Sequence, residues 1–126
     1  MSWPHFVCCL SVHTYPDPQD MPPVPNQFAE IGEFGGLGSY ISGKQWIEGS
    51  CFSYEHSGTP EMLAHRYIGM LQFVQLHKNH ISAVVYTQIT DVELECDGFL
   101  NYDRSNKFDN ATLATIKQTI IQLINS

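Results

Sequence analysis

The chain has few basic residues and no long apolar segment. Six Lys and Arg stand against 13 Asp and Glu, which gives a net charge of −7 at pH 7. Binding to nucleic acid or to an anionic membrane needs a basic surface that neutralises phosphates, so both partners are excluded. No apolar run approaches the roughly 18 residues of a membrane-spanning helix. The apolar run 6–10 is too short for the core of a signal peptide and follows no Lys or Arg, which favours a cytoplasmic location.

The cysteine and histidine residues lack the spacing of a metal site. The four cysteines are Cys8, Cys9, Cys51 and Cys96. They do not follow a zinc-binding pattern, and the first two are adjacent and cannot easily bridge each other. We therefore expect four free or buried thiols. His77 and His80 lie three residues apart without an evident third ligand, so the sequence predicts neither a metal nor a cofactor.

The hydrophobic pattern predicts one α/β domain, because 126 residues with 43% hydrophobic content suit a single core. The proline-rich segment Pro16–Pro25 predicts a loop. A helix is predicted after Thr59, a good N-cap that is followed by Pro60. A last helix is predicted after Asp109 or Asn110. The stripes that should pack against other elements are Leu63, Tyr67, Met70, Leu71 and Val74 in the first helix, and Leu113, Ile116, Ile120, Leu123 and Ile124 in the second.

The most informative run is Ala83–Arg104, AVVYTQITDVELECDGFLNYDR. It begins as a short buried strand, and Gln88, Asp91 and Glu93 follow where this strand ends. Polar groups at the end of a buried strand often serve binding, although a solvated turn explains the acidic residues equally well. The run resembles the last barrel strand of glycoside hydrolase family 2, the β-galactosidase and β-glucuronidase group.

Two further segments carry the same resemblance. Gly32–Gly38, GEFGGLG, follows a predicted strand at Phe28–Ile31 and is similar to the family's strand-seven motif, whose Glu is the catalytic nucleophile. Val12–Pro16, VHTYP, is similar to the motif that ends strand six. The three motifs stand in the family's order and span residues 6–109.

The resemblance implies an α/β fold, namely a partial (β/α)8 TIM barrel made of strands six to eight with their helices. Residues 1–126 would then form a C-terminal fragment of the family's catalytic domain, because a complete barrel needs about 250 residues. We expect Val7–Val12, Ala29–Glu33 and Ser82–Gln88 to lie parallel in one sheet, whose two open edges favour self-association. The family's general acid/base Glu lies on an absent strand, so the isolated chain is expected to be inactive.

The resemblance also implies a retaining glycoside hydrolase that takes a carbohydrate, a β-glycoside, as its substrate. Such enzymes use two carboxyl groups, one of which attacks the sugar, and Glu33 matches that nucleophile. Trp46, on the irregular stretch Gly43–Gly58, is expected to stack on a sugar ring or to pin its own loop. Two alternatives are a non-catalytic sugar-binding remnant and a subunit that completes a barrel with a partner chain. The residues assigned to substrate binding are His13, Tyr15, Trp46, Gln88, Asp91 and Glu93.

Four residues depart from the family's pattern, namely Ser11, Glu30, Cys96 and Asp97. Strand alternation predicts that Glu30 points away from Glu33 and toward the helix layer, where an unpaired charge is costly. These departures affect the expected sugar contacts and leave the predicted nucleophile in place.

Overall fold

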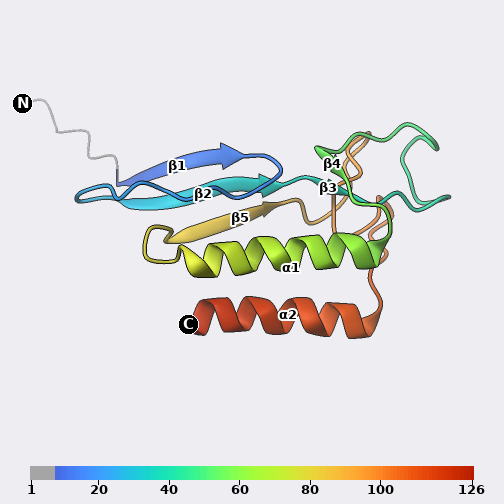
Figure 1. Cartoon of the computed structure of the whole chain (residues 1–126). Coiled ribbons are helices and arrows are strands. Elements are labelled where there is room, and N and C mark those ends of the chain that lie inside the picture. Colours follow the sequence, from blue (N-terminus) through green and yellow to red (C-terminus); the bar gives the residue numbers. More distant parts are fainter. Residues whose placement is uncertain (1–7) are drawn as a thin grey trace, which may run out of the picture.

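A computed structural model describes residues 8–126. Its main sheet holds β1 (Cys9–Thr14), β2 (Phe28–Gly35) and β5 (Ala83–Thr87) in the order β1-β2-β5, and both pairs are parallel. The predicted parallel arrangement is therefore confirmed, although Val7, the predicted start of the first strand, lies outside the described residues. Figure 1 shows the three strands running in one direction, so their carboxyl ends meet at one edge.

Two helices pack beside this sheet in the described chain. Helix α1 (Pro60–Leu76) begins at the predicted cap, since Thr59 Oγ1 accepts a 3.3 Å hydrogen bond from the Met62 N–H. Helix α2 (Asn110–Asn125) is capped by Asp109, whose carboxylate accepts a 2.7 Å bond from the Thr112 N–H. In Figure 1, α1 lies between the sheet and α2. No helix in the described part of the chain is long and apolar enough to cross a membrane.

The core lies between the sheet and α1. Ile31 and Phe34 of β2 are fully buried together with Leu63 of α1, and Met70 is almost as deeply buried. All five residues of the predicted α1 stripe are buried, so that prediction is confirmed. The α2 stripe packs more loosely: Ile116 is buried, whereas Ile124 remains 75% exposed.

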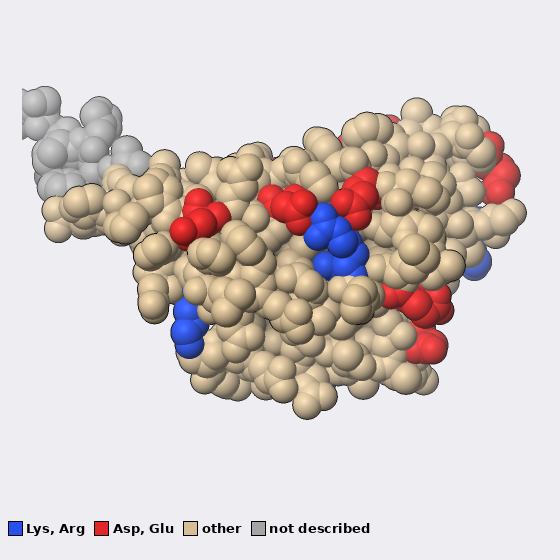
Figure 2. Space-filling model, in the orientation of Figure 1, with Lys and Arg blue, Asp and Glu red and all other residues tan. Residues whose placement is uncertain are grey.

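A second, two-stranded sheet extends the carboxyl end of the main one. It pairs β3 (Leu37–Gly38) with β4 (Glu55–His56) in parallel. Figure 1 places it with the loops that follow β2 and β5, beyond the arrowheads of the main strands. Arg66 of α1 fixes β4 by donating to both carboxylate oxygens of Glu55, and it also pairs with Asp17 after β1. Figure 2 shows a basic group that lies between acidic ones near the middle of one face of the molecule.

The predicted partial TIM barrel is wrong. Strands six to eight with their helices require three helices, and the described residues form only two. The connection from β1 to β2 is a loop that contains the proline-rich segment Pro16–Pro25, and proline removes the backbone N–H groups that a helix needs. The described chain is thus an α/β unit with a three-stranded parallel sheet and two helices.

The predicted direction of Glu30 is also wrong. Its neighbours Ala29 and Ile31 are 3% and 0% exposed and belong to the core, so Glu30 faces away from the helices. The register of β2 against β5 shifts between Ile31 and Phe34, and this irregularity breaks the strict alternation on which the prediction rested. The Glu30 carboxylate is therefore not buried against the helices.

Candidate active site

Glu33 and Tyr15 meet at the carboxyl edge of the main sheet. Glu33 lies near the end of β2, and Tyr15 directly follows β1. The Tyr15 hydroxyl donates a 2.5 Å hydrogen bond to Oε2 of Glu33. It forms a second bond, 3.0 Å long, with Oγ1 of Thr87 at the end of β5. All three strand ends thus contribute to the position of one phenol group.

His13 adds a third partner to the carboxylate. Its Nδ1 lies 3.4 Å from the same Oε2 of Glu33, because the two residues are register partners in β1 and β2. The side chains of His13 and Glu33 are 58% and 41% exposed, so a molecule from solvent can reach both. Both contacts fall on Oε2, and Oε1 has no hydrogen-bond partner among the residues that the structure describes.

The environment keeps Tyr15 protonated. Burial, followed by the hydrogen bond to Glu33, raises the pKa of the Tyr15 phenol to about 12. The phenol therefore remains a neutral hydrogen-bond donor over the whole physiological range. A neutral donor stabilises negative charge on Glu33 without forming an ion pair with it.

The glycines after Glu33 hold the strand ends together. The Gly35 N–H donates to the Pro16 carbonyl (2.9 Å) and the Gly36 N–H to the Thr87 carbonyl (2.7 Å). Gly35 and Gly36 have φ values of 105° and 65°. Glycine adopts such positive φ values at little cost because it has no Cβ. These two donors are directed at neighbouring backbone and not at Glu33. The glycine motif therefore shapes the site, while side chains supply the contacts to the carboxylate.

Two aromatic residues that the sequence did not assign to the site extend it outward. The Tyr54 ring stacks on the Tyr15 ring with centroids 3.9 Å apart and planes 8° apart. Phe52 meets Tyr54 edge to face at 5.3 Å. Gly36 permits this packing, because a Cβ there would collide with the Tyr54 ring. The sequence signal for them is their place on the long irregular stretch Gly43–Gly58, because loops of this length are often functional and aromatic residues on them could stack on a sugar ring.

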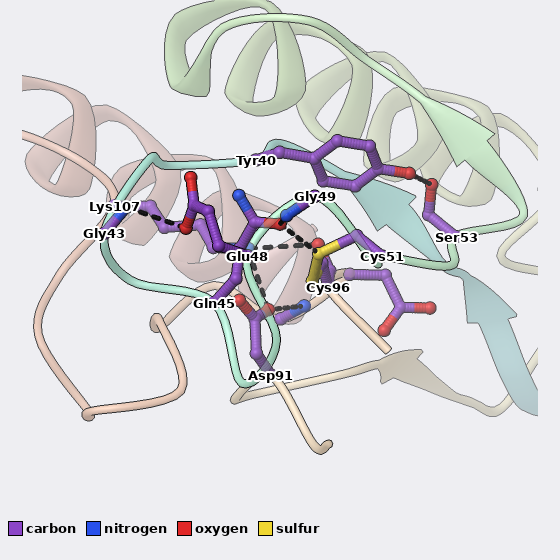
Figure 3. The surroundings of a disulfide bond; sticks show 12 residues. Tyr40, Gly43, Gln45, Glu48, Gly49, Cys51, Ser53, Asp91, Cys96 and Lys107 are labelled. Atoms are coloured by element: carbon purple, nitrogen blue, oxygen red, sulfur yellow. Dashed lines mark hydrogen bonds and ion pairs between the residues drawn. A yellow bond between two sulfur atoms is a disulfide. The ribbon is translucent and has the colours of Figure 1, made fainter. Parts of the chain in front are cut away.

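A disulfide fixes the loop that carries these aromatics (Figure 3). It joins Cys51 to Cys96, so the prediction of free thiols is wrong for this pair, whereas Cys8 and Cys9 are free. The two residues are 45 positions apart, and spacing rules say nothing about such a pair. Backbone hydrogen bonds bring them together, from Phe52 N–H to Leu94 O (2.6 Å) and from Cys96 N–H to Phe52 O (2.9 Å).

Gln88 lies after β5 but its amide is already engaged. Its Nε2 donates to Oδ1 of Asp97 (2.7 Å) and to Oε2 of Glu95 (3.3 Å). Asp97 is 1% exposed, and this burial raises the pKa of its carboxyl to about 6. Gln88 thus organises the acidic loop, and no contact joins it to Glu33 in the described structure.

Asp91 and Glu93 also stand apart from Glu33. Asp91 is 3% exposed; it binds the ammonium group of Lys107 (2.8 Å) and accepts the Gly98 N–H (2.8 Å). Sequence reasoning missed Lys107, which is itself 7% exposed. Glu93 is exposed in a turn with φ of 50°. The structure therefore gives Asp91 a role in folding the loop and leaves Glu93 in solvent.

Trp46 packs against the ring of Tyr102. Its ring lies 4.8 Å from the Tyr102 ring, and the residue is 52% exposed. This contact matches the alternative that the tryptophan pins its loop, although half of its surface remains open.

The site around Glu33 lies on a solvent-exposed edge of the main sheet. A hollow of about 580 Å³ lies elsewhere, against β4 and the first turns of α1, and Glu33 does not line it. Among residues 8–126, no group of three or more His, Cys, Asp or Glu side chains is arranged to hold a metal ion. Comparison of the chain with protein-family models and with curated proteins finds no match.

Proposed function

We propose that this chain carries the nucleophile of a retaining β-glycoside hydrolase and that Glu33 is that nucleophile. The observation that carries the proposal is the pair of contacts on Oε2 of Glu33, from Tyr15 at 2.5 Å and His13 at 3.4 Å, at the carboxyl edge of a parallel sheet. Reactive groups in folds with parallel strands gather at this edge. The motifs around His13, Tyr15 and Glu33 also resemble those of glycoside hydrolase family 2.

The geometry suits a carboxylate that attacks a sugar. Oε1 of Glu33 is free of described partners and would form the new bond to the anomeric carbon, while the bond to the leaving group breaks. Oε2 is held by Tyr15, which fixes the plane of the carboxylate. In the second step water displaces Glu33, and the phenol stabilises the charge that returns to the carboxylate.

The proton for the leaving group must come from a second carboxyl group. Retaining enzymes place it about 5–5.5 Å from the nucleophile, and its absence costs about 10²–10⁴ in rate. The proposal assigns no residue of this chain to that role. We therefore expect the chain alone to show no measurable hydrolysis of alkyl β-glycosides, whose leaving groups need a proton.

Trapping of the covalent intermediate tests the proposal. 2,4-Dinitrophenyl 2-deoxy-2-fluoro-β-glycosides of glucose, galactose and glucuronic acid release a stable anion, so the first step needs no acid. We expect one of them to label the chain, and peptide mapping should place the label on Glu33. Glu33→Gln should abolish labelling. The matched control Glu30→Gln, on the same strand, should keep it.

Two results would count against this assignment. A label on Asp91 or Glu93 with Glu33 unmodified would mean that the nucleophile is wrongly assigned. Sugar binding without any label would favour the alternative of a non-catalytic sugar-binding remnant.

A further inference from the structure

Tyr54 and Phe52 form an exposed aromatic surface that begins beside the candidate nucleophile. We call these two rings the aromatic platform. Tyr54 stacks face to face on Tyr15, whose hydroxyl binds Glu33, so the platform is in direct contact with the Tyr15 ring. Tyr54 and Phe52 are 53% and 49% exposed. The platform therefore continues the site outward from the carboxylate.

Backbone hydrogen bonds and a disulfide hold the platform in place. The Tyr54 N–H donates to the Gly36 carbonyl (2.9 Å), and Phe52 exchanges backbone hydrogen bonds with Leu94 and Cys96. The disulfide between Cys51 and Cys96 ties the residue next to Phe52 to the acidic loop. Rigid aromatic surface binds a ligand with little loss of conformational entropy, which is the property expected of a preorganised binding surface.

We infer that the platform is a subsite for a flat, apolar aglycone, so that the preferred substrates are aryl β-glycosides. This inference rests on the proposed function, because it needs the sugar to sit at Glu33. The hydroxyl-rich end of such a molecule meets His13, Tyr15 and Glu33, whereas the aryl ring meets Tyr54 and Phe52.

The polar groups near the platform argue against a second sugar as its occupant. A sugar needs hydrogen-bond partners for its hydroxyls. The backbone N–H and carbonyl of Phe52 are paired with Leu94 and Cys96, and the N–H of Tyr54 is paired with Gly36. What remains on the exposed side chains is ring surface and the single hydroxyl of Tyr54, which offers far fewer hydrogen-bond partners than a sugar has hydroxyls. An aryl group covers such a surface by stacking or edge-to-face contact.

Binding of matched glycosides tests the inference. The probes are the phenyl and methyl β-glycosides of glucose, galactose and glucuronic acid, together with free phenol. The protein carries Glu33→Gln, so that no glycoside is hydrolysed during the measurement. Affinity is measured by calorimetry or by NMR titration. For the sugar that binds, we expect the phenyl glycoside to bind about tenfold more tightly than the methyl glycoside, as one aromatic contact allows.

Variants at Phe52 test whether the platform causes the preference, because the ring contact of Phe52 is with Tyr54, whereas Tyr54 itself also stacks on Tyr15 and is tied to the Glu33 site. Phe52→Ala should bring the affinity for the phenyl glycoside close to that for the methyl glycoside and leave the latter unchanged. Phe52→Leu keeps apolar volume and should give an intermediate result if the alanine variant fails to fold. The control Phe28→Ala removes a ring that is 45% exposed at the opposite end of β2 and should change neither affinity.

The outcomes separate this inference from the proposed function. Equal affinity for phenyl and methyl glycosides, or a preference that survives both Phe52 variants, would overturn the aglycone subsite and leave Glu33 as the nucleophile. Free phenol that binds as tightly as the phenyl glycoside would show adsorption unrelated to a sugar site and would also overturn it. Failure of every glycoside to bind, together with failure of the labelling experiment, would overturn both.

Discussion

The hydroxyl of Tyr15 donates a 2.5 Å hydrogen bond to Oε2 of Glu33, although 18 residues separate them. The bond exists because β1 and β2 run parallel and place their carboxyl ends side by side. It gives an exposed carboxylate a fixed orientation, which an acidic residue in a solvated turn would not have. This relationship distinguishes Glu33 from the other acids near the strand ends.

Loss of the Tyr15 hydroxyl should slow labelling without disturbing the fold. Tyr15→Phe keeps the ring that stacks on Tyr54 and removes the donor to Glu33. We expect labelling by the fluoro glycoside to slow by about 10²-fold, because the attacking carboxylate loses the hydrogen bond that fixes its orientation. The control Tyr40→Phe removes a hydroxyl that bonds Ser53 instead and should label normally. Equal rates for the two variants would mean that the phenol does not assist Glu33.

Stability should depend on pH through Asp97. Burial raises the pKa of this carboxyl from 3.8 to about 6, so the folded state holds the proton more tightly than the unfolded state does. The stability that this proton gives is fully present below about pH 4 and is lost as the pH rises through 6. Asp97→Asn carries no charge and keeps an oxygen that can accept from Gln88.

Urea unfolding across pH 4 to 8 tests this assignment. At pH 8 the Asn variant should be more stable than the wild type by about 1–3 kcal/mol, and the difference should fall toward zero at pH 4. A difference that is constant with pH would contradict the raised pKa.

Much of the fold follows from local sequence signals. Thr59 and Asp109 mark the starts of the two helices through their capping hydrogen bonds, and the stripe from Leu63 to Val74 identifies the buried face of α1. The parallel sheet follows from the order of the motifs. The barrel prediction failed because it extended a family's architecture over Pro16–Pro25, where the chain's own prolines already indicated a loop.

The site was predictable only where neighbouring strand ends define it. His13, Tyr15 and Glu33 come together, as their positions at the ends of two predicted strands suggested. The pairing of Asp91 with Lys107 could not be predicted, because the two residues lie 16 positions apart and no periodic pattern in the sequence indicates such a buried pair. The contact of Cys51 with Cys96 is likewise a product of tertiary folding.

The Cys51–Cys96 disulfide should contribute strongly to stability. It closes a loop of 45 residues, and the loop-closure model gives about 4 kcal/mol for a loop of this length. The double variant Cys51→Ser, Cys96→Ser should therefore unfold at a lower urea concentration than the wild type. Thiol titration of the unfolded, unreduced wild type should find two reactive thiols, from Cys8 and Cys9. Four reactive thiols, or a variant as stable as the wild type, would contradict this bond.

The last prediction isolates the contact between Gly36 and the Tyr54 ring. Gly36 and Gly43 both have positive φ, 65° and 77°, so alanine at either position is strained by about 1 kcal/mol. A Cβ at Gly43 meets nothing within 4 Å, whereas a Cβ at Gly36 collides with the Tyr54 ring. Gly43→Ala is therefore a matched control that carries the backbone strain without the collision.

Gly36→Ala should disturb the stacking of Tyr54 on Tyr15, because the added Cβ would overlap with the Tyr54 ring, and the ring must move to relieve the overlap. We expect it to cost about 1–3 kcal/mol more in unfolding free energy than Gly43→Ala, the range for overpacking at a tight contact. The ring-proton shifts of Tyr15 and Tyr54, read by NMR, should change in the Gly36 variant alone, since stacked rings shield each other. Labelling of Glu33 should slow in the same variant if Tyr15 loses its orientation. Identical stability, ring shifts and labelling rates in the two alanine variants would show that Gly36 supplies backbone conformation only and does not position the aromatic platform.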